Sequence, residues 1–178
     1  KKTYVFLDQY IPFHPDYLTL PHRFPPDPDV YYPRLVGYLR EVKKKYRFEE
    51  ILIARHPDSA GKELSYLKEF RTTVGNSAEA VREADMVGTH NSNSAVFAIQ
   101  LGKPVVHVLL PGALPEDHHR ITLQRSRSMG TELHTFDRQL HIQPRRKMRN
   151  YLARHLMLRH LSPESPTLCD YHRRGVLP

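Results

Sequence analysis

The sequence contains one cysteine, no tryptophan and no long hydrophobic run. The lone cysteine, Cys169, excludes an internal disulfide framework and any metal site built from several cysteines. The lack of about 18 consecutive apolar residues excludes a transmembrane helix. The 178 residues are 39% hydrophobic and 26% charged, which is typical of one soluble globular domain. Because the chain begins at Lys1 without a methionine or a signal-peptide pattern, we expect a fragment or a processed form of a longer protein.

Acidic residues are scarce in the last quarter of the chain. Residues 138–178 hold nine Lys/Arg and two Asp/Glu, so they carry +7 of the formal net charge of +8. A nucleic-acid binder usually spreads its cations over its reading face, and the nearly neutral remainder leads us to expect no specific nucleic acid. We therefore divide the chain into a domain over residues 1–137 and a basic C-terminal helix and tail over residues 138–178. The helix is expected over residues 145–161, from Arg145 to Leu161.

Apolar runs typical of buried strands alternate with segments of helical periodicity. The expected strands are 4–7, 50–54, 72–74, 85–88, 104–110 and, at an edge, 132–136. The expected helices are 33–46, 62–70, 77–84, 95–101 and 117–129. This alternation predicts an α/β fold, a Rossmann-like doubly wound parallel sheet of about five or six strands with helices on both faces. Residues 12–33 hold seven of the fifteen prolines, and we expect neither helix nor central strand before Pro33.

Small polar residues fill the turn before the expected helix 95–101. They are Thr89, Asn91, Ser92, Asn93 and Ser94. A helix N-terminus offers free N–H groups and a positive dipole end, which together favour an anion. The simpler alternative is that Asn91 or Ser92 only caps the helix. Because a cap needs one residue and the turn supplies several, we predict that it binds an anionic group.

Polar residues also follow the first two strands, where ligands of open α/β sheets bind. Gln9 comes after the first strand, and Arg55-His56-Pro57 ends the second. Because Pro57 disfavours the helical conformation for the preceding residue, His56 is expected to stay at the strand end. There His56 can donate to a phosphate oxygen while Arg55 balances the charge. The alternative is that His56 is only a polar loop residue.

Several catalytic motifs are absent from the sequence. Gly61-Lys62 is followed by Glu63, where a P-loop needs Ser or Thr, and no G-x-G-x-x-G follows the first strand. No H-E-x-x-H accompanies the twelve histidines, and no G-x-S-x-G marks a hydrolase. We therefore expect no metal and no bound cofactor.

The order of these motifs resembles the C-terminal donor-binding domain of GT-B glycosyltransferases. Within that group it is most similar to bacterial sialyltransferases, polysialyltransferases and capsule polysaccharide transferases that use CMP-activated sugars. The resemblance covers roughly residues 3–110. It is carried by His56-Pro57, by Ser92-Asn93-Ser94, by the segment AIQLGKP over 98–104, and by the opening Phe6-Leu7-Asp8-Gln9 with His14-Pro15.

The resemblance implies that the chain is the donor-binding half of a metal-independent glycosyltransferase. The expected donor is a nucleotide-sugar, a CMP-sugar first, used for a surface polysaccharide. The family pattern implies that His56 holds the phosphate and stabilises the leaving group, and that Ser92, Ser94 and Thr89 hold the nucleotide. The general base of the family is an acidic residue of an N-terminal acceptor domain, which we expect to lie outside this chain. The catalytic base is therefore unassigned, and the isolated chain is expected to be inactive.

Two other functions are compatible with the same sequence features. One is a fragment of a GT-B-like nucleotide-sugar epimerase, and the other is a non-enzymatic module that binds membrane or nucleic acid through its basic tail. The basic amphipathic pattern over residues 145–161 indicates contact with an anionic membrane surface, unless it is an ordinary closing helix with a solvated basic face. We expect the protein in the cytoplasm, or at the inner face of the membrane as a peripheral protein if residues 145–161 bind there.

Overall fold

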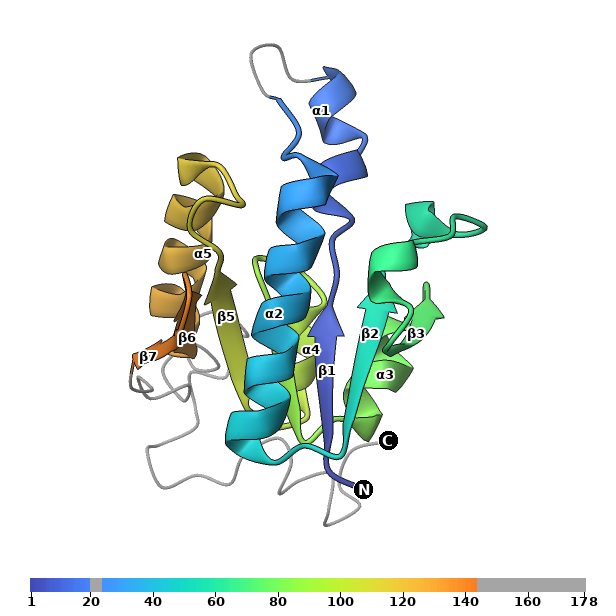
Figure 1. Ribbon diagram of the computed structural model, residues 1–178. Helices are drawn as coiled ribbons and strands as arrows, with labels where there is room; N and C mark the ends of the chain where they lie inside the picture. The colour runs from blue at the N-terminus through green and yellow to red at the C-terminus, as the bar shows by residue number, and fades with distance from the viewer. Residues whose placement is uncertain (20–23, 144–178) are drawn as a thin grey trace.

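A computed structural model describes residues 1–19 and 24–143, which form one seven-stranded sheet covered by helices (Figure 1). The strand order is β3-β2-β1-β4-β5-β6-β7. The strands are β1 (Thr3–Leu7), β2 (Glu50–Arg55), β3 (Arg71–Val74), β4 (Met86–Thr89), β5 (Val105–Leu109), β6 (Glu132–Phe136) and β7 (Leu140–Gln143). Neighbours among the first six pair in parallel, and β7 pairs antiparallel with β6. This is the doubly wound, Rossmann-like order, so the expected α/β fold is confirmed.

Alternate residues of the central strands belong to two different hydrophobic cores. In β1, Tyr4 and Phe6 pack into the core on one face, whereas Val5 and Leu7 pack into the core on the other. A parallel strand that is buried on both faces needs such an unbroken apolar run. The apolar runs in the sequence were therefore sufficient to predict these strands.

The helices divide between the two faces. Helix α2 (Pro28–Tyr46) covers one core, and α3 (Ser77–Glu83) and α4 (Ala95–Gln100) cover the other, together with Met129 at the end of α5 (Glu116–Met129). Figure 1 shows α2 in front of the sheet and α4 behind it. Short helices occupy the connections after β1 and β2. They are η1 (Ile11–Phe13), α1 (Asp16–Thr19), η2 (Pro57–Ser59) and η3 (Ser65–Leu67).

The proline-rich segment contains more helix than its composition predicts. Helix α2 begins at Pro28, so the expectation of no helix before Pro33 is wrong for residues 28–32 and for the short η1 and α1. Pro28 occupies the first turn, where a missing N–H costs nothing, and the Asp27 side chain accepts from the backbone N–H of Asp29 at 2.8 Å. Pro33 lies inside the helix, where the complete burial of the tyrosines at 31 and 32 compensates for the lost hydrogen bond.

The expected helix over residues 62–70 is reduced to the single turn η3. Leu67 is the only buried residue in that stretch, so it offers no continuous apolar stripe to pack. Short helices gain most of their stability from such packing, which explains why the segment stays irregular.

The sheet extends past the expected boundary at residue 137. Strand β7 falls within 138–143 and pairs with β6, so the sheet has one strand more than expected and β6 is not its edge. The helix expected over residues 145–161 lies outside the described residues. Within residues 1–19 and 24–143, no helix combines the length and the apolarity that a membrane crossing requires.

Candidate functional site

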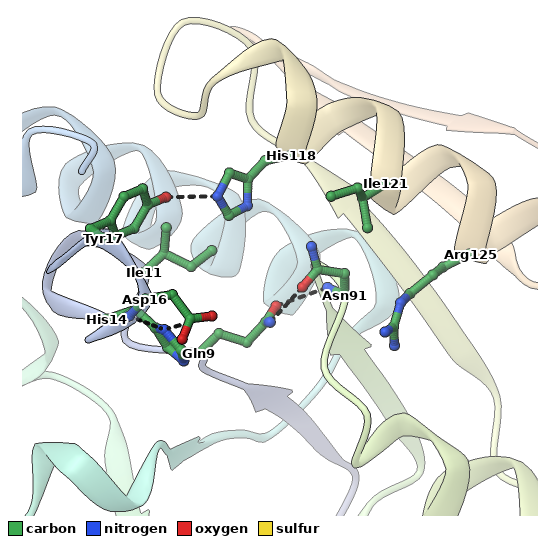
Figure 2. Close-up of a pocket in the computed structure, with 9 residues that line it drawn as sticks. All are labelled: Gln9, Ile11, His14, Asp16, Tyr17, Asn91, His118, Ile121 and Arg125. Carbon is green, nitrogen blue, oxygen red and sulfur yellow. Dashed lines mark hydrogen bonds and ion pairs between the residues drawn. The ribbon is translucent and has the colours of Figure 1, made fainter. Parts of the chain in front are cut away.

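The strand order reverses between β1 and β4, and ligands of open α/β sheets bind beyond the strand ends at such a point. The side chain of Gln9 bridges this gap after β1. Its Oε1 accepts from the backbone N–H of Asn91 at 2.8 Å, and its Nε2 donates to the Oδ1 of Asn91 at 2.5 Å. The two strand ends are therefore held at a fixed separation by one paired amide contact, which Figure 2 shows.

A cleft of about 740 Å³ opens at this edge of the sheet. Its walls come from the segments that follow β1, β2, β3 and β4, and from α5. A smaller hollow of about 250 Å³ adjoins it and shares five lining residues, Gln9, His14, Asp16, Asn91 and Arg125 (Figure 2). Both volumes lie near the range that small-molecule sites occupy, roughly 300–1,000 Å³.

Seven of the nine predicted binding residues line the large cleft. They are Gln9, His56, Pro57, Asn91, Ser92, Asn93 and Ser94. The other two, Arg55 and Thr89, do not line it. The Arg55 guanidinium donates to the carbonyls of Ser59 and Lys62 at 3.0 and 2.6 Å, so it holds the loop after β2. Thr89 is fully buried, and its Oγ1 accepts from the backbone N–H of Ser92 at 3.0 Å.

The simpler alternative, a capping role for Ser92, fits the contacts around that residue, because the carbonyl of Ser92 accepts from the backbone N–H of Ala95 at 3.2 Å. The N-cap residue of α4 is Ser94, whose side chain makes no capping hydrogen bond. The Oγ of Ser92 instead accepts from the backbone N–H of Ser94 at 3.2 Å. Asn93 is held from across the cleft, because its Oδ1 accepts from Arg125 Nη2 at 2.9 Å. The turn is thus ordered by its own contacts and by α5.

Six further polar residues of the cleft were not among the predicted site residues: His14, Asp16, Asp8, Asn76, Ser77 and Arg125. A sequence signal existed for the first two, because His14-Pro15-Asp16 repeats the tripeptide at 56–58. Arg125 had no such signal, since it comes from the middle of a helix. Figure 2 shows Arg125 extending from α5 toward Asn91, so the cation of this cleft is Arg125 rather than Arg55.

Asp8 lies at the floor of the cleft and is 4% exposed. Its Oδ1 accepts from the backbone N–H of Tyr10 at 3.2 Å, whereas its Oδ2 has no hydrogen-bond partner within the described residues. Burial raises the pKa of Asp8 to about 6, and this effect exceeds the opposing influence of the Tyr10 N–H and of Arg55. A buried carboxyl group with a raised pKa therefore lines the cleft.

His90, the remaining residue of the turn after β4, has a structural role. It is fully buried, its Nδ1 lies 2.7 Å from the carbonyl oxygen of Val108, and its Nε2 lies 3.1 Å from the hydroxyl of Tyr31. Burial lowers the pKa of His90 to about 3, so the ring is neutral. His90 thereby ties the end of β4 to β5 and α2. Within the described part of the chain, no three His, Cys, Asp or Glu side chains gather as metal ligands.

No family model matches the sequence, and no curated protein matches it either. Among solved structures, two of KpsC from Thermosulfurimonas dismutans, a β-Kdo 2,7 and a β-Kdo 2,4 transferase, are 22% and 19% identical over 61% of this chain, with TM-scores of 0.36 and 0.39. This chain spans about a third, 34%, of each KpsC chain.

Two further structures give matches of the same strength. The rhamnosyltransferase SpnG, solved with spinosyn aglycone, is 15% identical over 72% of this chain and 30% of its own, with a TM-score of 0.35. YxkO from Bacillus subtilis, which is not described as a glycosyltransferase, is 11% identical over 79% of this chain and 61% of its own, with a TM-score of 0.37. At these scores the matches do not bear on the fold of this chain or on what it binds or catalyses.

Proposed function

We propose that the cleft binds the nucleoside phosphate of an activated sugar and that the chain is the donor-binding half of a glycosyltransferase. The observation that carries this proposal is the cleft of about 740 Å³ at the switch point between β1 and β4, which His56 and residues 91–94 line. These groups are hydrogen-bond donors and acceptors, as recognition of a phosphate and a ribose requires.

The cleft offers different chemistry for the two ends of a nucleotide. Phe97 of α4 lines it and is 43% exposed, and an exposed aromatic ring is a suitable platform on which a base can stack. His56 and Arg125 supply an N–H donor and a positive charge for the phosphate. Because the motif order resembles transferases that use CMP-sugars, we propose cytidine as the base and a surface polysaccharide as the product.

The proposed reaction is a displacement at the anomeric carbon. The acceptor hydroxyl oxygen forms the new bond to that carbon, and the bond from carbon to the phosphate oxygen breaks with its electron pair remaining on the phosphate. The hydroxyl proton passes to a base that we propose an N-terminal acceptor half supplies. Donors aimed at the phosphate, where charge develops, can contribute several kcal/mol in a site that excludes water. This chain therefore stabilises the leaving group, and no metal is required.

Nucleotide titration of the purified chain tests the proposal. Adding CMP, CDP, UMP or UDP is expected to shift the NMR signals of residues 56, 57 and 91–94, with CMP the strongest ligand. His56→Ala is expected to weaken binding by about 1–3 kcal/mol, since a hydrogen bond to a charged group is lost. The matched control is His141→Ala, which removes an exposed histidine of β7 at the far edge of the sheet. Signals at these residues that stay unchanged with all four nucleotides would contradict the proposed function.

A further inference from the structure

The tripeptide His-Pro-Asp occurs twice, at 14–16 after β1 and at 56–58 after β2, and both copies adopt the same local geometry. In each copy the histidine Nδ1 accepts a hydrogen bond from the backbone N–H of the aspartate two residues later, at 3.3 Å. The aspartate Oδ2 lies 3.4 Å from the same Nδ1 in the first copy and 3.6 Å in the second. The loop after β1 and the loop after β2 therefore each hold a histidine ring in the same way.

The contact with the backbone N–H favours one tautomer of the neutral ring. An Nδ1 atom that accepts a hydrogen bond is unprotonated, so the neutral ring bears its proton on Nε2 and donates from there. Neither Nε2 has a hydrogen-bond partner among the described residues. Each turn thus leaves one N–H donor unused.

Both imidazole rings line the same cleft. His14 and His56 line the large cleft with side chains 27% and 31% exposed, and their ring centroids are 5.1 Å apart at an interplanar angle of 64°. The Arg125 guanidinium lines the same cleft. If a ring gains a proton on binding a doubly charged group, the aspartate of its own turn is placed to accept the new Nδ1–H. Two adjacent N–H donors near one cation suit a group with several anionic oxygens.

We propose that His14 and His56 form a two-point clamp, in which both Nε2–H groups donate to one phosphate bound in the cleft. The clamp assigns a ligand-binding role to His14, which lies outside the motif elements named for nucleotide binding. It rests on the proposed function for the identity of the ligand. The chemistry that the clamp recognises, anionic phosphate oxygens, can nevertheless be tested without a nucleotide.

The decisive variant is His14→Phe, which keeps an aromatic ring against His56 and removes the N–H donor. We expect it to weaken the binding of CMP and of inorganic phosphate by about tenfold, the effect of one lost charged hydrogen bond of about 1.4 kcal/mol, and to leave cytidine binding unchanged. His14→Gln restores an N–H donor and is expected to recover part of the affinity. The matched control is His141→Phe, and long-range ¹⁵N spectra of the free protein should show the Nε2–H tautomer for both His14 and His56.

The outcomes separate the clamp from the proposed function. If His56→Phe weakens phosphate binding and His14→Phe does not, the clamp is wrong and the proposed function stands. If the parent binds phosphate through both histidines but binds no nucleotide, the clamp stands and the proposed function is wrong. If the parent binds neither ligand, both are overturned. Binding that disappears on adding EDTA and returns with Zn²⁺ would overturn the clamp as well, since the ring nitrogens would then be metal ligands.

Discussion

Asp8 shows how one buried side chain contributes to the pH dependence of the stability of the fold. Its pKa rises from 3.8 in the unfolded chain to about 6 in the folded protein because the carboxyl is buried. Between pH 4 and pH 6 the folded state therefore binds more protons than the unfolded state. The contribution of Asp8 to the free energy of unfolding therefore falls as the pH rises through this window, by about 3 kcal/mol in total.

Asp8→Asn is expected to remove this fall in the free energy of unfolding. The amide carries no charge, and its Oδ1 can still accept from the backbone N–H of Tyr10. The stability of the variant relative to the parent should rise by about 3 kcal/mol between pH 4 and pH 7, measured by urea unfolding at four pH values. His90 and His107, whose burial lowers their pKa to about 3 and about 4, destabilise the protein as the pH falls, but they do so in both proteins and cancel in the difference. A difference that stays flat with pH would show that Asp8 is solvated.

At the scale of single elements, the most informative case is a helix that carries a proline in its second turn. Pro33 of α2 has no N–H, so the carbonyl of Asp29 lacks its usual helical donor. The residue is exposed, which means that its replacement does not disturb a core. The complete burial of Tyr31 and Tyr32 beside it shows that packing holds this turn in place.

Pro33→Ala is expected to raise the free energy of unfolding by about 1–3 kcal/mol, since it restores the hydrogen bond and removes the ring clash. Pro28→Ala is the matched control, because a proline in the first turn breaks no hydrogen bond and its replacement should gain little. Urea unfolding of both variants measures the contrast. Equal stabilities would mean that α2 bends at Pro33 to relieve the strain.

The elements that could be predicted from the sequence are those with a long periodic pattern and the strands that are buried on both faces of the sheet. Strands β1, β2 and β5 are continuous apolar runs, and their neighbours follow from the alternation with helices. Strand β7 was missed because Leu140-His141-Ile142-Gln143 alternates over only four residues next to a basic segment. The start of α2 was missed because its signals, the Asp27 cap and Pro28 in the first turn, lie in a proline-rich segment whose composition indicated no helix.

Site residues that directly follow a strand could be predicted from the sequence, whereas a residue that helix packing brings to the cleft could not. Gln9, His56 and Asn91 were predictable together because the carboxyl ends of parallel strands share one edge of the sheet. Thr89 is the last residue of its strand, and the pleat places its side chain in the interior rather than in the cleft. Arg125 reaches the cleft only because α5 packs beside β5, a relation that no local pattern in the sequence encodes.

At the scale of the whole molecule, charge separates two parts of the chain. Residues 1–137 are nearly neutral, whereas seven Lys/Arg and no Asp/Glu fall within residues 138–163. A local cluster of cations near an anionic bilayer contributes about 1 kcal/mol per cation, while the same number spread over a neutral body contributes little. We therefore propose that residues 145–161 bring the protein to an anionic membrane surface, where an enzyme that builds a surface polysaccharide would meet its acceptor.

Two variants of equal net charge test this proposal. Replacing Arg145, Arg146, Lys147 and Arg149 with Gln is expected to abolish co-sedimentation with vesicles that contain anionic lipid. Replacing the exposed Lys43, Lys44, Lys45 and Lys68 of the folded body with Gln removes four charges as well, and it should leave sedimentation unchanged. Binding by the parent should also weaken with salt, because screening shortens to about 10 Å at 0.1 M ionic strength. If the two variants lose binding equally, net charge rather than the basic segment draws the protein to the membrane. If the parent does not sediment with the vesicles at all, residues 145–161 do not bind the membrane and the proposal is wrong.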